Sequence, residues 1–359
     1  MRRTLASFLL AVAATAASAE PFSYSTVKVA DGIYLFTESF GHAVVSGNSL
    51  VIVGDDGVAV VDTGHHPDLT RRMVADIKAL TPKPVLYVVN THWHNDHVAG
   101  NFIYAEAFPG VKFVAHAFTS QLMDTETRRY QGPGCTPFIN AQIQPLRDIL
   151  ASGQGPEGTP LTDARRARIQ QVVADAEAGI EDCAKFRYKG ADLTFEDRVT
   201  LRLGNRDAQV MFLGRANTAG DAVVYVPDAK VVATGDIVVH PFPFAFGSYI
   251  GEWPVVLRKI VAMNATAIVP GHGPVMHDTS YLATTAELME SIDSQVRAAY
   301  RPGISVEDVR KAVDVSAYRK RICGDDPALL ANFDNSVMGA GISRAYQAAK
   351  GQMEPEGVK

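Results

Sequence analysis

The chain has 359 residues, of which 47% are hydrophobic and 20% charged, and its formal net charge is −5. This length suits one large domain with appended segments, because single hydrophobic cores stop growing at about 250 to 300 residues. The negative charge argues against a nucleic-acid substrate, since phosphate binding needs a basic surface. We therefore expect a small-molecule substrate and leave the oligomeric state open.

Residues 1–19 have the pattern of a secretory signal peptide. Two arginines precede an apolar stretch from Leu5 to Ala17, and Ala17-Ser18-Ala19 has the small residues of a cleavage site. The stretch is shorter than the roughly 20 residues that a membrane span requires, which disfavours the alternative of an N-terminal anchor. We predict a periplasmic or secreted protein that has no stable membrane anchor after cleavage.

The following segment alternates between strand and helix patterns. Turns at Asp31-Gly32 and at residues 55–57 separate β-branched runs, which predicts strands joined by hairpins. A helix is expected from Pro67 to Leu80, because Pro67 suits a first helical turn and two prolines follow the end. Strands at 85–89 and 111–115 and a helical stretch after residue 117 complete this half.

Between about residues 128 and 189 glycines and prolines interrupt helical segments near 143–150 and 162–178, which predicts a helical insertion. We expect it to form a lid or substrate wall, with packing alone as the alternative. Cys135 and Cys183 bracket this region, and Cys323 lies beyond it. In an oxidising compartment the first two are the favoured pair, whereas three buried free thiols remain the alternative.

A second series of strands precedes a helical tail. Strands are expected near 193–195, 199–203, 208–212, 222–226, 231–233 and 267–269, with a helix at 253–263 before the last of them. Apolar positions at helical spacing then predict helices at 280–300, 305–313 and 327–349. We expect this tail to pack on the strands.

A dense cluster of metal-binding side chains follows the strand at 85–89, within the segment His92-Trp93-His94-Asn95-Asp96-His97. Neutral imidazoles and carboxylates are donors that zinc prefers. Two histidines spaced two apart in an extended chain project to the same side, so His92 and His94 can hold one ion, while Asp96 and His97 can turn towards a second. The alternative is a polar loop whose histidines cluster by chance.

The segment Thr91–Gly100 resembles the H-x-H-x-D-H signature of the metallo-β-lactamase-fold hydrolases, and the likeness continues from about Val29 to His272. It includes residues 48–64, which end in Asp62-Thr63-Gly64, and the segments 234–236 and 270–273. The resemblance implies an α+β fold, a four-layer αββα sandwich of two similar halves. We place this domain at 20–279, with the insertion at about 128–189 and a helical C-terminal extension at 280–359.

The resemblance also implies a two-ion ligand set, in which Asp236 bridges a first position (His92, His94 and a third histidine) and a second position (Asp96, His97 and His272). Asn217 stands where the third histidine is expected. An amide oxygen is a poorer donor to zinc than imidazole, so weak coordination by Asn217, a water in its place, or binding only at the second position all stay open. We expect one or two zinc ions, the second position being the more secure.

Other side chains are candidates for supporting roles. Asp62 is expected to orient the metal loop through hydrogen bonds. His116 and His240 are candidates for contact with ligands or substrate, with a purely structural role as the alternative. Tyr249 and Trp253 belong, with Phe242, Phe244 and Phe246, to an aromatic segment that could form either an apolar wall for substrate or part of the core.

The leading functional hypothesis is an exported hydrolase that cleaves an ester, lactone or amide bond, including a β-lactam, through a metal-bound hydroxide. Asp96 and Asp236 would orient the nucleophile, and Asp96 would pass a proton to the leaving group. Iron-dependent sulfur oxidation is an alternative enzyme class on the same fold. The non-enzyme alternative, prompted by Asn217, is a catalytically degenerate exported metal-binding protein.

Overall fold

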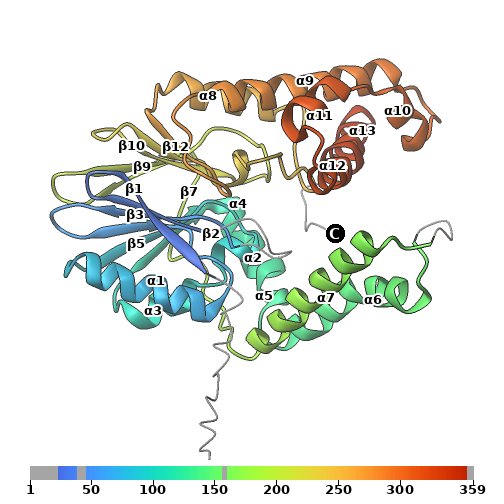
Figure 1. Ribbon diagram of the computed structural model, residues 1–359. Helices are drawn as coiled ribbons and strands as arrows, with labels where there is room; N and C mark the ends of the chain where they lie inside the picture. Colours follow the sequence, from blue (N-terminus) through green and yellow to red (C-terminus); the bar gives the residue numbers. More distant parts are fainter. Residues whose placement is uncertain (1–22, 39–45, 156–159, 354–359) are drawn as a thin grey trace, which may run out of the picture.

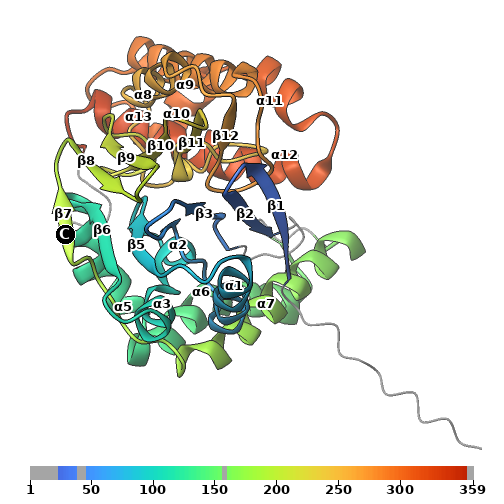
Figure 2. The same ribbon diagram turned by 90° about the vertical axis from the view of Figure 1, so that its left-hand side faces the viewer.

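The computed structural model describes residues 23–38, 46–155 and 160–353. The predicted signal peptide, residues 1–19, lies outside the described residues. Two β-sheets pack face to face, and helices cover the outer surface of each, as Figures 1 and 2 show from two directions. This arrangement confirms the α+β class and the four-layer αββα sandwich, although the two sheets differ in size.

The first sheet has seven strands in chain order. They are antiparallel from the first to the fourth and parallel from the fourth to the seventh. Parallel neighbours require crossovers, and helices α1 (Pro67–Leu80) and α3 (Asn101–Ala107) make the first two on the outer face. The strands are β1 (Tyr24–Ala30), β2 (Ile33–Glu38), β3 (Ser49–Val53), β4 (Val58–Val61), β5 (Val85–Asn90), β6 (Lys112–His116) and β7 (Leu193–Phe195).

The second sheet has five strands in the order β12-β11-β10-β9-β8. Helices α8 (Trp253–Ala262) and α9 (Ser280–Ala299) cover its outer face. The chain passes between the sheets after β7 through a short turn into β8. The strands are β8 (Arg198–Arg202), β9 (Asp207–Phe212), β10 (Ala222–Val226), β11 (Val231–Ala233) and β12 (Ala267–Val269).

The alternation of strand side chains places the core on both faces of the first sheet. Val89 points inwards and packs with Val210 and Val224 of the second sheet, whereas its neighbour Val88 faces outwards and packs with Met73 of α1. A strand covered on both faces reads as a continuous apolar run, which is why 85–89 was recognisable in the sequence.

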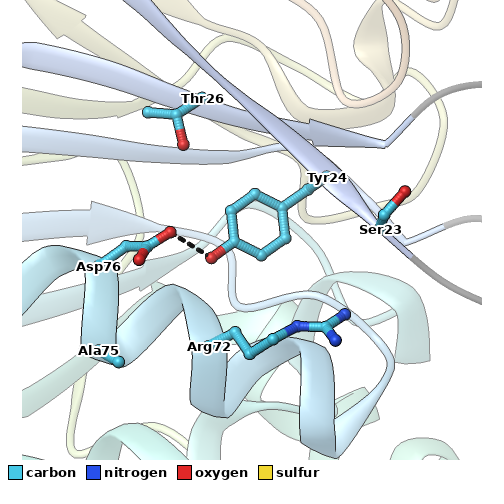
Figure 3. Close-up of a pocket in the computed structure, with 6 residues that line it drawn as sticks. All are labelled: Ser23, Tyr24, Thr26, Arg72, Ala75 and Asp76. Atoms are coloured by element: carbon cyan, nitrogen blue, oxygen red, sulfur yellow. Dashed lines mark hydrogen bonds between the residues drawn. The ribbon is translucent and has the colours of Figure 1, made fainter. Parts of the chain in front are cut away.

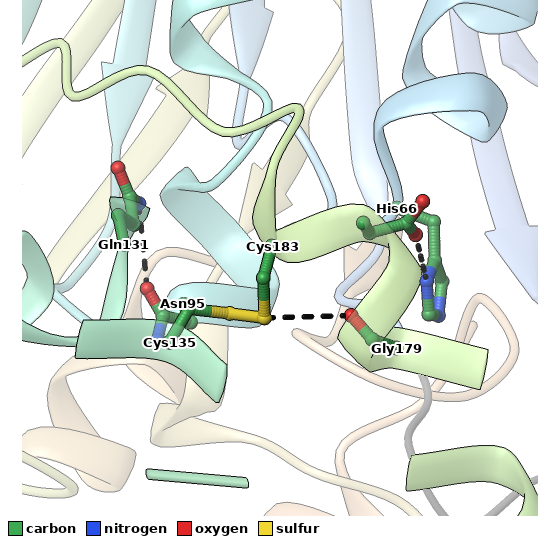
Figure 4. The surroundings of a disulfide bond; sticks show 7 residues. His66, Asn95, Gln131, Cys135, Gly179 and Cys183 are labelled. Atoms are coloured by element: carbon green, nitrogen blue, oxygen red, sulfur yellow. Dashed lines mark hydrogen bonds and ion pairs between the residues drawn. A yellow bond between two sulfur atoms is a disulfide. The ribbon is translucent and has the colours of Figure 1, made fainter. Parts of the chain in front are cut away.

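The predicted insertion is helical and lies between β6 and β7. A disulfide joins Cys135 to Cys183 (Figure 4), so the favoured pairing is confirmed. Cys323 is a free, buried thiol. The two long helices pack on each other through Ile143, Ile169 and Val173. The segments are α4 (Ala117–Leu122), a π-helical turn (Met123–Thr127), α5 (Arg128–Tyr130), a 3-10 turn (Gly132–Gly134), α6 (Cys135–Ser152) and α7 (Asp163–Cys183).

The C-terminal extension is helical, as predicted, and shares one hydrophobic core with α8 and the second sheet. One helix, α11, was not expected from the sequence, and the expected helix at 327–349 contains a π-helical stretch at Asp334–Gly341. The remaining helices are α10 (Val306–Ala312), α11 (Ser316–Cys323), α12 (Pro327–Phe333) and α13 (Ile342–Ala349). Across the described ranges, every helix is too short or too polar to span a membrane.

Four loops leave the ends of parallel strands at the same edge of the sandwich. Asp62 follows β4 and Thr91 follows β5, which are parallel neighbours, while Thr234 follows β11 and Pro270 follows β12, which are also parallel neighbours. A surface pocket of about 370 Å³ lies elsewhere, between β1 and α1, where Tyr24 Oη donates to Asp76 Oδ2 at 2.5 Å (Figure 3). None of the candidate site residues lines that pocket.

Candidate metal centre

The loop after β5 brings its imidazoles together. His92 Nε2 lies 3.0 Å from His94 Nδ1, so both nitrogens face one point. Helix α2 (Asn95–Val98) then turns the chain and directs Asp96 and His97 to the same region. The metal loop is supported from behind by the start of the insertion, where Thr127 Oγ1 donates to the Trp93 carbonyl at 2.6 Å.

Asp96, His97, Asp236 and His272 form the rest of the cluster. Asp96 Oδ2 lies 3.0 Å from His272 Nε2, and His97 Nε2 lies 3.2 Å from Asp236 Oδ1. The candidate donors form two groups, and within each group the donor atoms all lie within 4.8 Å of one another. One group is His92, His97 and Asp236, and the other is Asp96, His97 and His272. The structure therefore brings all six predicted ligands to one place, and His97 belongs to both groups.

Asp62 orients His97, which is the role expected for it. Its Oδ2 accepts from His97 Nδ1 at 2.8 Å and from Thr91 Oγ1 at 2.7 Å, and its Oδ1 accepts from the Thr91 backbone N–H at 2.8 Å. A carboxylate on Nδ1 requires a proton there, which leaves the Nε2 lone pair directed at the cluster.

Asp62→Asn tests this orientation. An amide has an NH₂ group in place of one of the two acceptor oxygens, so in either amide orientation it leaves a donor of Thr91 or His97 unpaired and disturbs the tautomer of His97. We expect the affinity for the tighter-bound ion to fall about 10- to 100-fold. Competition with a chelator measures this, with Asp76→Asn as the control; equal affinities in the two variants would contradict the assignment.

The charges within the cluster favour a cation. Burial would raise the pKa of Asp236, but His97, His272 and His92 hold the pKa of that carboxyl well below its usual range. Burial and the charge of His97 lower the pKa of His92, which keeps it neutral and able to ligate. Burial also opposes protonation of His97, yet Asp236, Asp96 and Asp62 raise its pKa well above the ordinary value. A metal cation could replace that proton, so the donor set suits zinc.

Close backbone approaches hold the surrounding loops together. A Cβ at Gly47 would lie 2.4 Å from the His97 ring, and one at Gly271 would lie 2.0 Å from Asp236 Oδ1, so neither position has room for a side chain. Asn48 holds residues 270–273, the last loop of the centre, because its Nδ2 donates to the Pro270 carbonyl at 2.9 Å. The tight approach explains why glycine stands at 47 and 271.

Asn217 is fully buried, and its amide has a defined orientation. Its Nδ2 donates to the Phe244 carbonyl at 2.6 Å, so Oδ1 points the other way and has no hydrogen-bond partner among the described residues. The loop is held by Asp221, whose carboxylate accepts from the backbone N–H groups of Ala216 and Thr218. Burial raises the pKa of Asp221 to about 7.

The two remaining candidate histidines have other contacts. His116 caps α4, because its Nδ1 accepts from the Phe118 backbone N–H at 3.2 Å, and its ring stacks on Phe212. These contacts give His116 a structural role, and its contact with substrate stays a prediction. His240 lies beside the last loop, where its backbone N–H donates to the His272 carbonyl at 3.1 Å.

The aromatic segment divides into core and surface residues. Trp253 is fully buried, and its Nε1 donates to the Ile237 carbonyl at 3.0 Å, which fixes the turn that carries Asp236. Tyr249 is 2% exposed. For these two residues the structure selects the core alternative over the substrate wall. Phe244 and Phe246, in contrast, are 37% and 40% exposed.

The family model that describes the metallo-β-lactamase superfamily matches the sequence over residues 42–272, which is more than half of the chain. The chain belongs to the metallo-β-lactamase superfamily. The matched range contains all four loops of the metal centre and ends at His272, so membership accounts for the donor cluster as well as the sandwich.

Several proteins share this superfamily membership at low identity. A linear primary-alkylsulfatase from Pseudomonas sp. (strain ATCC 19151) is 26% identical over 240 residues, which are 62% of this chain but only 40% of that protein. A type 2 metallo-β-lactamase from Bacillus cereus is 22% identical over 279 residues, which are 76% of this chain and 84% of that enzyme.

Solved structures of superfamily members show the same fold. A metallo-β-lactamase from Pontibacter korlensis superposes with a TM-score of 0.50 at 22% identity, covering 75% of this chain and 99% of that one. The DIM-1 metallo-β-lactamase gives a TM-score of 0.50 at 20% identity, covering 74% of this chain and 97% of that one. At this identity the likeness concerns the fold alone.

Some supporting contacts of this superfamily member were missed in the sequence, although Phe244 itself belongs to the aromatic segment singled out there. Asn48, Thr127, Asp221 and Phe244 all support the metal loop, the last loop or the Asn217 loop. For Asp221 a signal existed, since an aspartate after a Thr-Ala-Gly turn is well suited to accept backbone N–H groups. For the other three the contacts join residues at least 27 positions apart, and local pattern carries no signal of them.

Proposed function

We propose that this superfamily member is a zinc-dependent hydrolase that cleaves an ester, lactone or amide bond of a small molecule, including a β-lactam. The carrying observation is the convergence of six imidazole and carboxylate side chains at one edge of the sandwich, where His97 belongs to both groups of donors. The likeness to an alkylsulfatase adds sulfate esters to the substrate classes worth testing.

The chain's residues supply binding and proton transfer. His92, His94, Asp96, His97, Asp236 and His272 would hold the metal, and a bound zinc ion supplies Lewis acidity and lowers the pKa of water towards about 7. Asp96 is 27% exposed, whereas the Asp236 side chain is 4% exposed. Because Asp96 faces solvent, it is the carboxylate placed to hand a proton to a leaving group, while Asp236 stays as a buried orienting group.

Metal removal tests the activity. We expect chelator-treated protein to lose about 100-fold or more in kcat/KM, since metal catalysis contributes several kcal/mol, and to recover on adding zinc. The measurement uses p-nitrophenyl esters, aromatic lactones, nitrocefin and an alkyl sulfate, together with elemental analysis for zinc and iron. Turnover that is unchanged by chelation would reject the proposal.

The second candidate function is a metal-binding protein without turnover. Asn217 favours it, because a weaker donor at the first position reduces the chance of an active two-ion centre. Bound metal with no hydrolysis of any substrate in the panel would support this candidate over the enzyme.

We also propose that the protein is exported. The pattern of residues 1–19 and the Cys135–Cys183 disulfide support this, because disulfides persist in oxidising compartments. N-terminal sequencing of protein from the periplasmic or culture fraction should begin at Glu20.

A further inference from the structure

Two exposed aromatic rings lie beside the metal donors. The rings of Phe244 and Phe246 are 4.8 Å apart, and the Phe244 ring lies 5.8 Å from the ring of His94. Among the described residues, the other large exposed apolar side chains are aliphatic, such as Leu80 and Val255. Phe244 thus presents apolar surface to solvent directly beside His94, a predicted metal ligand.

The backbone beneath these rings is held by the C-terminal extension. Ser336 is 3% exposed, and its hydroxyl donates to the Pro243 carbonyl at 2.8 Å and accepts from the Ala245 backbone N–H at 3.0 Å. These two hydrogen bonds hold the residues on either side of Phe244. The Phe244 carbonyl itself accepts from Asn217 Nδ2, so the backbone of Phe244 is held by both Ser336 and Asn217.

A second side chain of the extension holds the next part of the segment. Arg344 Nε donates to the Ser248 carbonyl at 3.0 Å, and another nitrogen of its guanidinium donates to the Gly247 carbonyl at 3.0 Å. Arg344 therefore also holds the backbone that follows Phe246. A surface ordered in advance loses less conformational entropy when a ligand covers it.

We propose that Phe244 is a specificity-determining contact for an alkyl or aromatic group of the substrate, and that Ser336 is the positioning residue that holds it beside His94. This inference rests on the proposed function, because the metal centre fixes the polar end of the substrate. A group attached next to the reacting bond then lies against Phe244, and its burial favours apolar over small substrates.

A series of linear carboxylates tests the subsite without requiring turnover. Acetate, butyrate and hexanoate bind a metal centre through the same carboxylate, so only the alkyl chain differs. A fully buried CH₂ group contributes up to about 4-fold in affinity. Since Phe244 is only partly buried, we expect hexanoate to bind zinc-loaded protein about 10-fold more tightly than acetate by isothermal titration calorimetry.

The variants separate the subsite from the metal centre. Phe244→Ala should reduce the preference for hexanoate to less than about 2-fold while leaving acetate affinity unchanged, and Phe244→Leu should give an intermediate preference. Ser336→Ala should also weaken the preference, with acetate affinity retained, which a general loss of stability would not produce. Val255→Ala, an exposed residue of α8, is the matched control and should keep the full preference.

Each outcome decides one of three claims: the subsite, the accessible metal centre or the positioning role of Ser336. Equal affinities for acetate and hexanoate in the unmodified protein, or a preference that survives Phe244→Ala, would overturn the subsite alone. Failure of every carboxylate to bind zinc-loaded protein would overturn the accessible metal centre and with it the proposed function. A preference that survives Ser336→Ala would remove the positioning role of that residue.

Discussion

Asn217→His should increase the affinity of the first metal position by at least about 10-fold, a change no smaller than those caused by residues that only orient ligands. The reason is the donor, since imidazole is a better ligand for zinc than a neutral amide oxygen. The side chain at 217 is buried, and Asp221 holds the backbone of its loop, so the replacement starts from an ordered position. The free Oδ1 of Asn217 marks the acceptor that the imidazole would replace.

Metal titration measures this change. We expect the variant to retain a second zinc ion at chelator concentrations that remove it from the unmodified protein, with an altered cobalt absorption spectrum as an independent sign. Asn217→Ala is the control and should bind the ion at the first position no more tightly than the unmodified protein. Unchanged stoichiometry and affinity in Asn217→His would show that residue 217 does not face the metals.

Removing the disulfide should cause the largest loss of stability. The Cys135→Ser, Cys183→Ser double variant opens a loop whose ends are 48 positions apart. Loop-closure entropy predicts a loss of about 4 kcal/mol in the free energy of unfolding. Both cysteines are buried with residues of α1 and α3, so the base of the insertion packs on the first half of the sandwich.

Urea denaturation of the oxidised, zinc-loaded protein provides the measurement. Cys323→Ala is the matched control, since Cys323 is buried but unpaired, and it should cost only about 1 kcal/mol. A loss in the double variant no larger than that of the control would contradict the prediction.

The lid or substrate wall expected from the insertion stays a prediction, but Gln131 of this region contacts Asn95 of the metal loop (Figure 4).

Elements with strong local signals were predicted to within one or two residues. Helix α1 runs from Pro67 to Leu80, as expected from the prolines at its start and beyond its end, and strands β7, β10 and β11 have the expected bounds. Helix α11 was missed because Cys323 is its only buried residue. A helix that buries so little has no apolar stripe to reveal it.

The sequence by itself predicted the metal loop, because His92, His94, Asp96 and His97 lie within six residues and so stay close to one another in any fold. It did not determine which aromatic side chains would be covered. Tyr249, Trp253, Phe244 and Phe246 are close in sequence and all aromatic, yet only the first two are buried. Burial depends on whether distant helices cover a side chain, and Ser336 and Arg344 decide how this segment lies. The amide orientation of Asn217 likewise follows from Phe244, a contact between distant positions that only tertiary packing creates.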